Sequence, residues 1–188
     1  FLGGEDEKKW GDNERTFRPE YLRCSQPKSG YKNVRCFPSC SFGGHSVNSY
    51  CGESVQATVE YGVQDVGSLM AWGEMVEPSI ELNMYEGMRM RLSDAYQKQR
   101  TKKDFKNPWV VGELMSYEAG KEARFVFNRE GLGWHYGWES NKMTCKNYHV
   151  FRVYLFRRIS GDEIEYVGHL CSPKFQIYSK RRQRKITE

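Results

Sequence analysis

The sequence predicts an all-β protein, an antiparallel β-sandwich with long loops and little helix. Several runs alternate apolar and polar residues, which is the period of a half-buried strand. Turn residues separate these runs at short intervals, and the alternation of strands with helices that marks a parallel sheet is missing. The chain has 188 residues, 14% of them aromatic, which is enough to build a hydrophobic core without disulfide or metal staples.

Three segments differ in composition. Residues 1–52 combine an acidic lead-in with a stretch rich in Cys, Gly, Ser and Pro, which predicts loops and short strands packed on the main domain. Residues 53–180 carry the strand patterns and are predicted to form the β-sandwich. Residues 181–188 form a basic tail.

The first strand is expected at 54–61, where apolar and polar residues alternate. Alternation at 80–84 and 88–92 predicts two more strands. The glycines at 62, 67 and 73 are interpreted as breaks in the intervening stretch. A short helical turn is expected from 94 to 100, because this stretch is rich in helix formers.

The second half of the domain begins with a basic loop at 97–108 and strand candidates at 109–114 and 123–127. The longest β-prone run is 149–158. It is followed by a turn at 160–163 and a returning strand at 164–170, the pattern of a β-hairpin. A last short strand is expected at 175–178.

Positive charge is concentrated at the C-terminus. The chain has a net charge of +5, and residues 141–188 contain eleven bases and four acids. Such asymmetry favours a polyanionic partner. We expect double-stranded DNA, with no membrane and no small-molecule substrate. No apolar stretch is long enough to predict a membrane span. No catalytic motif is present, so an enzyme is not predicted.

Two groups of side chains are candidate DNA contacts. Lysines and arginines bind phosphates, whereas arginine and asparagine also recognise base edges. Arg100 and Asn107 of the basic loop are the predicted base contacts. The hairpin turn and the chain exit are expected to gather further basic residues at one end of the sandwich. The predicted phosphate contacts are Lys102, Lys103, Lys106, Arg157, Arg158, Lys180, Arg181, Arg182, Arg184 and Lys185.

Cys36, Cys40, His45 and Cys51 form the candidate metal site. Thiolates and an imidazole in a Gly- and Ser-rich loop can surround a tetrahedral structural zinc. Their spacing differs from paired C-x-x-C motifs, so disulfides and buried thiols remain alternatives. No other cofactor is predicted. Cys145 and Cys171 lie in apolar runs and are expected to pack in the core.

The stretch FRVYLFRRISGDEIEYVGHLCSPKFQIYSKRRQRK, residues 151–185, resembles the end of an immunoglobulin-fold transcription-factor domain of the Rel-homology or STAT-like kind. The resemblance implies an immunoglobulin-like sandwich that holds DNA through its loops and a basic exit. It also implies a homodimer, because such domains often bind palindromic sites.

The sequence therefore predicts sequence-specific double-stranded DNA binding by a nuclear transcription regulator. The alternative is a secreted or cell-surface disulfide-bonded β-sandwich that binds a protein or an acidic glycan. The six cysteines permit the second interpretation, and the basic tail, which is typical of nuclear localisation signals, favours the first.

Overall fold

The structure is a computed structural model that describes residues 22–23, 32–34, 54–60, 66–104, 106–118, 122–129, 134–136, 143–144 and 147–176. The strands are β1 (Leu22–Arg23), β2 (Lys32–Val34), β3 (Val55–Glu60), β4 (Leu69–Val76), β5 (Arg89–Arg91), β6 (Val110–Glu118), β7 (Glu122–Phe127), β8 (Trp134–Tyr136), β9 (Tyr148–Ser160), β10 (Glu163–Cys171) and β11 (Phe175–Gln176). A 3-10 helix, η2 (Val66–Ser68), precedes β4, and the helix α1 (Leu92–Lys98) follows β5.

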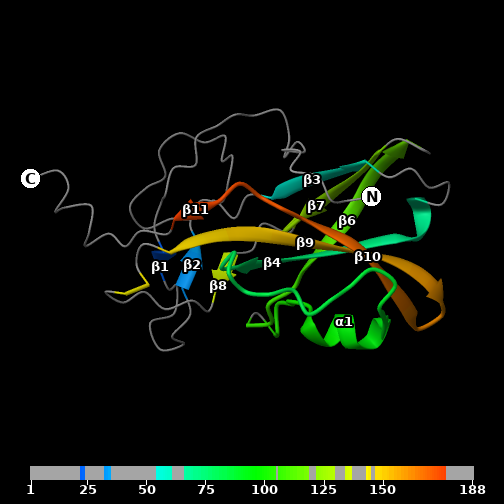
Figure 1. The fold of residues 1–188 in the computed structure, drawn as a ribbon, viewed down its shortest axis with the longest axis horizontal. Coiled ribbons are helices and arrows are strands. Elements are labelled where there is room, and N and C mark those ends of the chain that lie inside the picture. The colour runs from blue at the N-terminus through cyan, green and yellow to red at the C-terminus, as the bar shows by residue number, and fades with distance from the viewer. Residues whose placement is uncertain are drawn as a thin grey trace, which may run out of the picture.

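Eight strands form one large antiparallel sheet in the order β3-β7-β6-β4-β9-β10-β5, with β11 paired to the start of β9 (Figure 1). A smaller sheet has the order β1-β2-β8. The predicted all-β class with little helix is confirmed. The described strands do not confirm the finer prediction of two sheets packed as a sandwich.

Strand β9 lies at the centre of the large sheet. Its residues from His149 to Phe156 are all buried, so both faces of the sheet are covered there. Because side chains alternate along a strand, Phe151, Val153 and Leu155 point to one face, and Tyr154 and Phe156 to the other. Because neither face of β9 meets solvent there, its sequence is mostly apolar and does not alternate with polar residues.

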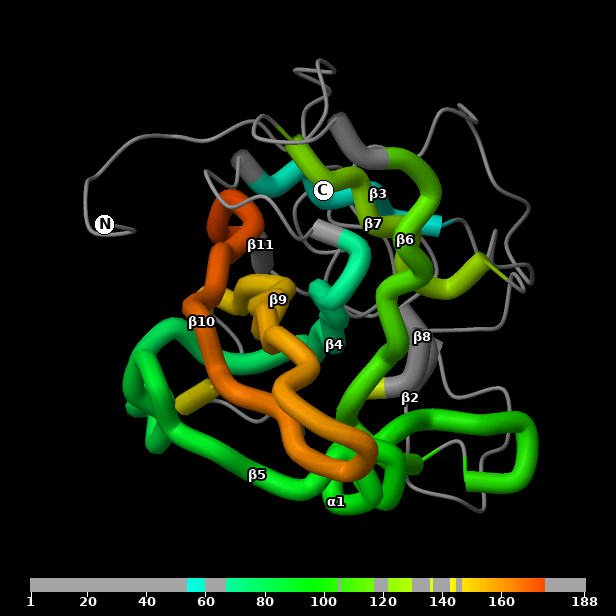
Figure 2. Tube along the Cα trace, turned by 90° about the vertical axis from the view of Figure 1, so that its right-hand side faces the viewer, coloured from blue at the N-terminus to red at the C-terminus, as the bar shows by residue number. Residues whose placement is uncertain are grey.

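The first face holds a core of small aliphatic and phenylalanine side chains. The rings of Phe127 and Phe151 meet edge to face with centroids 5.3 Å apart. Side chains from β3 and β7 belong to the same cluster as those of β4 and β9, and residues of β10 pack against it. The sheet therefore curves around this core, as its end-on view in Figure 2 shows.

The opposite face holds an aromatic core covered by α1. Trp72 of β4 contacts Phe156 and Trp109, with ring centroids 5.5 and 6.1 Å apart. Leu92 and Ala95 of α1 are buried against this cluster. The turn between β9 and β10 holds the start of the helix, because the carboxylate of Asp162 accepts hydrogen bonds from the Ser93 amide and hydroxyl. Figure 1 shows α1 below the sheet.

Most predicted strands are confirmed within a few residues, including the β9–β10 hairpin and the strands that became β3, β6 and β7. The short helix after β5 is also confirmed. The strand predicted at 80–84 is wrong. Leu82 and Met84 do turn inward against the aromatic core, but the segment crosses the sheet face without a strand partner among the described residues. Arg152 holds it there by donating to the Ile80 carbonyl at 3.1 Å.

Two further predictions fail. The break predicted at Gly73 lies inside β4, an eight-residue strand next to β9 that the sequence patterns missed. Cys171 was expected in the core, but it is exposed at the end of β10. Cys145 lies outside the described residues.

Candidate nucleic-acid interface

Basic residues gather along one continuous segment, from β5 through α1 and into the loop that follows. Residues 89–107 carry seven bases and two acids, a net charge of +5, whereas residues 66–88 carry four acids and no base. Four of the seven bases, Arg100, Lys102, Lys103 and Lys106, were predicted contacts. The prediction omitted Arg91 and Lys98, which are exposed at the two ends of α1.

We call residues 99–109 the lysine loop. Its two ends are tied together, because the Arg100 amide donates to the Trp109 carbonyl at 2.6 Å and the Trp109 amide donates to the Lys98 carbonyl at 3.1 Å. The buried Trp109 ring anchors one end in the aromatic core, and the ammonium of Lys98 lies 4.9 Å from the centroid of this ring.

Asn107 fixes the lysine loop to the end of α1. Its side-chain Nδ2 donates to the carbonyls of Gln97 and Gln99, at 2.9 and 3.0 Å. Gln97 lies in the last turn of α1, whose carbonyls lack partners within the helix, and Gln99 is the C-cap residue that follows it. The Asn107 carbonyl in turn accepts from the Arg100 Nε at 3.2 Å.

The tip of the lysine loop has its own hydrogen bonds. The Asp104 amide donates to the Thr101 hydroxyl at 2.9 Å, and that hydroxyl donates to the Asp104 carboxylate at 3.3 Å. The Asn107 amide donates to the Asp104 carbonyl at 3.2 Å. As a result, the side chains of Lys102, Lys103 and Lys106 are held on the outside, where all three are exposed.

Arg100 and Asn107, the predicted base contacts, are therefore parts of the loop framework. The side-chain amide of Asn107 already donates to the carbonyls of Gln97 and Gln99. Arg100 is half-buried, and burial lowers its pKa to about 10, so its guanidinium stays charged at neutral pH. Among the predicted contacts of this loop, the structure leaves the three lysines facing solvent.

The two predicted arginines of the hairpin lie on opposite faces of the sheet. Arg158 is paired with the core residue Ile164, and its guanidinium donates to the carbonyls of Ser160 and Gly161 in the turn. Arg157 lies on the other face, away from α1, and its Nη2 donates to Glu165 at 2.5 Å.

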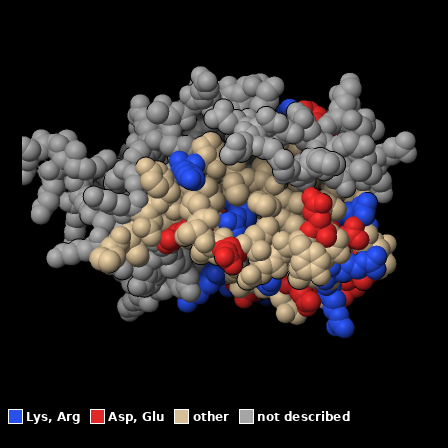
Figure 3. Space-filling view, viewed as in Figure 1, with Lys and Arg blue, Asp and Glu red and all other residues tan. Residues whose placement is uncertain are grey.

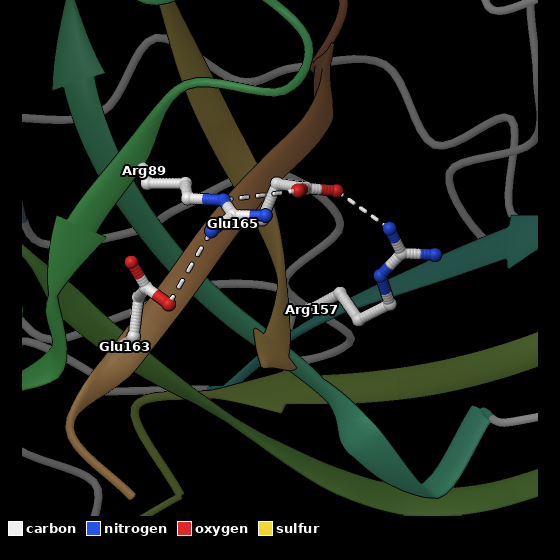
Figure 4. A network of polar contacts seen from close by, with 4 residues as sticks. All are labelled: Arg89, Arg157, Glu163 and Glu165. Atoms are coloured by element: carbon white, nitrogen blue, oxygen red, sulfur yellow. Dashed lines mark hydrogen bonds and ion pairs between the residues drawn. The ribbon is translucent and has the colours of Figure 1, made fainter. Parts of the chain in front are cut away.

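Glu165 links Arg157 to a wider ion-pair network (Figure 4). Arg89 of β5 lies 3.6 Å from both Glu163 and Glu165. Figure 3 shows basic and acidic side chains intermixed at the right-hand end of the molecule, where the hairpin turn lies in Figure 1. The hairpin end therefore carries balanced charge, which gives little net attraction for a polyanion.

The predicted gathering of the hairpin arginines and the chain exit at one end stays a prediction, because the tail residues lie outside the described part of the chain. Strand β11 is the last described element, and its Phe175 pairs with His149 at the start of β9. Arg158 lies nine residues further along β9, and with a rise of about 3.3 Å per residue this is about 30 Å away. The described chain thus leaves at the end opposite to the hairpin turn, as Figure 1 shows.

The remaining predicted site residues lie outside the described part of the chain. They are the metal candidates Cys36, Cys40, His45 and Cys51 and the tail residues Lys180, Arg181, Arg182, Arg184 and Lys185. Among the described residues, no three His, Cys, Asp or Glu side chains gather as metal ligands would. The zinc and tail contacts stay predictions.

The fold and site define a class: an antiparallel β-sheet protein that presents a short helix and a basic loop on one face. Comparisons with models of protein families, with curated proteins and with solved structures found no match to this chain. Within the described ranges, no helix has the length and apolar character required to cross a membrane.

Proposed function

We propose that this chain binds double-stranded DNA sequence-specifically, as a nuclear transcription regulator, and that the lysine loop grips the phosphate backbone. The observation that carries the proposal is the placement of Lys102, Lys103 and Lys106 on the outside of a loop fixed by its own hydrogen bonds. A fixed loop loses little conformational entropy when it binds, so more of its electrostatic attraction appears as affinity.

The surroundings of the loop favour the same partner. Arg91 and Lys98 add exposed positive charge at the two ends of α1. Neutralising phosphates releases condensed counterions, which makes such binding strong at low salt and weak at high salt. The basic tail at 180–185 provides a second sequence-encoded attraction for DNA and a signal for nuclear import.

The test is the affinity for a fluorescent duplex measured over a series of salt concentrations. Replacing Lys102, Lys103 and Lys106 together by alanine should weaken binding to all sequences. The plot of log K against log salt concentration has a negative slope, and each lost phosphate contact makes it less steep by about 0.9. The slope of the triple variant should therefore be less steep by up to about 2.7.

The matched control removes three exposed bases outside residues 89–107, namely Arg124 on β7, Arg129 after β7 and Lys174 between β10 and β11. It changes the net charge equally but should leave the slope near that of the wild type. Equal losses in the two triple variants would mean that only net charge matters, and unchanged binding in the lysine variant would contradict the proposed interface.

A further inference from the structure

Sequence-specific binding requires a side chain that reaches base edges. In the lysine loop, the amide donors of Asn107 are used by helix carbonyls, and the hydroxyl of Thr101 is bonded to Asp104. The proposed function assigns Lys102, Lys103 and Lys106 to the phosphate backbone. The candidates that remain in the basic segment lie on α1.

The outward face of α1 carries polar side chains that suit base recognition. Leu92 and Ala95 face the aromatic core, whereas Asp94 and Gln97, three residues apart, are exposed on the same side of the helix. No hydrogen bond of the Gln97 side chain to the described residues is found. A glutamine amide matches the N6 and N7 positions of adenine in the major groove.

The helix also has suitable dimensions and position. An α-helix with its side chains is about 10–12 Å across, and the major groove is about 12 Å wide. Figures 1 and 2 both show α1 at the periphery of the described fold, next to the β9–β10 turn. A duplex approaching the lysine loop from this side would meet α1 at the same time.

We propose that α1 enters the major groove and that Gln97 is the specificity-determining residue, which contacts an adenine while Lys102 and Lys103 hold the flanking phosphates. The inference rests on the proposed DNA-binding function. The two parts form one unit, because the backbone carbonyl of Gln97 accepts the hydrogen bond from Asn107 of the lysine loop. Asn107 is thus a positioning residue that sets the base contact relative to the phosphate contacts.

The experiment selects bound sequences from a random duplex pool with the wild type and with Gln97→Ala, Gln97→Glu and the control Gln56→Ala. Gln56 is an exposed glutamine on β3, in a different part of the sheet. We expect Gln97→Ala to lose preference at one position by about tenfold, and Gln97→Glu to favour cytosine there, because a carboxylate accepts from the cytosine N4 amino group.

Both Gln97 variants should keep the salt slope of the wild type, because no phosphate contact is lost. A wild-type motif that persists unchanged in Gln97→Ala and Gln97→Glu would overturn the inference and leave the proposed function standing. Duplex binding without any motif, or no binding by the wild type, would overturn both.

Discussion

Phe151 occupies the space that a side chain at position 73 would need. A Cβ added to Gly73 would lie 2.1 Å from the Cζ atom of this ring, well inside van der Waals contact. Gly112 on β6 has the same relation to Phe127, at 2.6 Å from Cε1. The two glycines allow β4 and β6 to pass beneath an edge-to-face pair of buried rings.

Gly73→Ala should therefore destabilise the fold. The Phe151 ring cannot move away easily because it is fully buried against Phe127, and overpacking of this kind costs about 2 kcal/mol. The measurement is the midpoint of denaturant unfolding. Gly161→Ala is the control, since a Cβ there meets nothing within 4 Å and should change the free energy of unfolding by less than about 0.5 kcal/mol. Equal midpoints would show that β4 and β9 adjust to the added methyl.

The same glycine explains why β4 escaped prediction. A glycine between apolar residues normally indicates a break, and nothing near position 73 in the sequence reveals that Phe151 will cover it. The β9–β10 hairpin was predictable because its signals are local: a long β-prone run, a turn and a returning strand. The hairpin could thus be predicted because it depends on neighbouring residues. Strand β4 could not, because its glycine depends on a contact with a residue that is distant in sequence.

At the scale of elements, the lysine loop also has features that the local sequence predicts and features that depend on distant contacts. Its basic composition is visible in the sequence, but the roles of Arg100 and Asn107 depend on where α1 ends. The separation of Arg157 from Arg158 was accessible from sequence, because neighbours on a strand point to opposite faces. The ion pair of Arg157 with Glu165 was not, since it depends on the register of the hairpin.

Asn107→Ala should open the lysine loop. The change removes two hydrogen bonds to the end of α1, together worth about 1–2 kcal/mol. If opening precedes cleavage, trypsin should cut after Lys102 or Lys103 about tenfold faster. DNA affinity should fall as well, although no charge is lost.

Asn83→Ala is the matched control, because Asn83 is exposed on the segment before β5. Its tryptic pattern and DNA affinity should equal those of the wild type. Cleavage at Lys102 and Lys103 that stays slow in Asn107→Ala would show that the amide bonds do not restrain the loop.

At the scale of the whole molecule, the hairpin turn and the last described strand, β11, lie at opposite ends of β9. Helix α1 begins at the hairpin turn and, with the lysine loop, covers one face of the sheet. The net charge of +5 therefore does not describe an even surface. The described residues combine a nearly neutral hairpin end with a basic segment whose position is set by Trp109 and Asn107.

The small sheet and the large sheet are joined by a contact that should make stability depend on pH. The Tyr136 ring of β8 meets His149 of β9, with its hydroxyl 3.0 Å from Nδ1. Burial raises the pKa of Tyr136, with Glu77 and Glu74 adding to the effect, so the hydroxyl stays protonated and donates to a neutral imidazole. Burial also lowers the pKa of His149 to about 4, despite the opposing effect of Glu77.

The sign of the pH effect follows from the two states of His149. Its pKa is about 6.5 in the unfolded chain, so between pH 6.5 and 4 the unfolded state binds more protons than the folded state. The free energy of unfolding should fall by about 3 kcal/mol as the pH drops through this window, and this group should lower it no further below about pH 4.

His149→Gln removes the titrating group. The free energy of unfolding of this variant, measured in denaturant, should therefore change less with pH than that of the wild type. Partial burial and the charge of Arg152 also lower the pKa of His169, so His169→Gln measures a second contribution to the same profile. Parallel profiles for the wild type and His149→Gln would mean that the imidazole is charged where the two sheets meet.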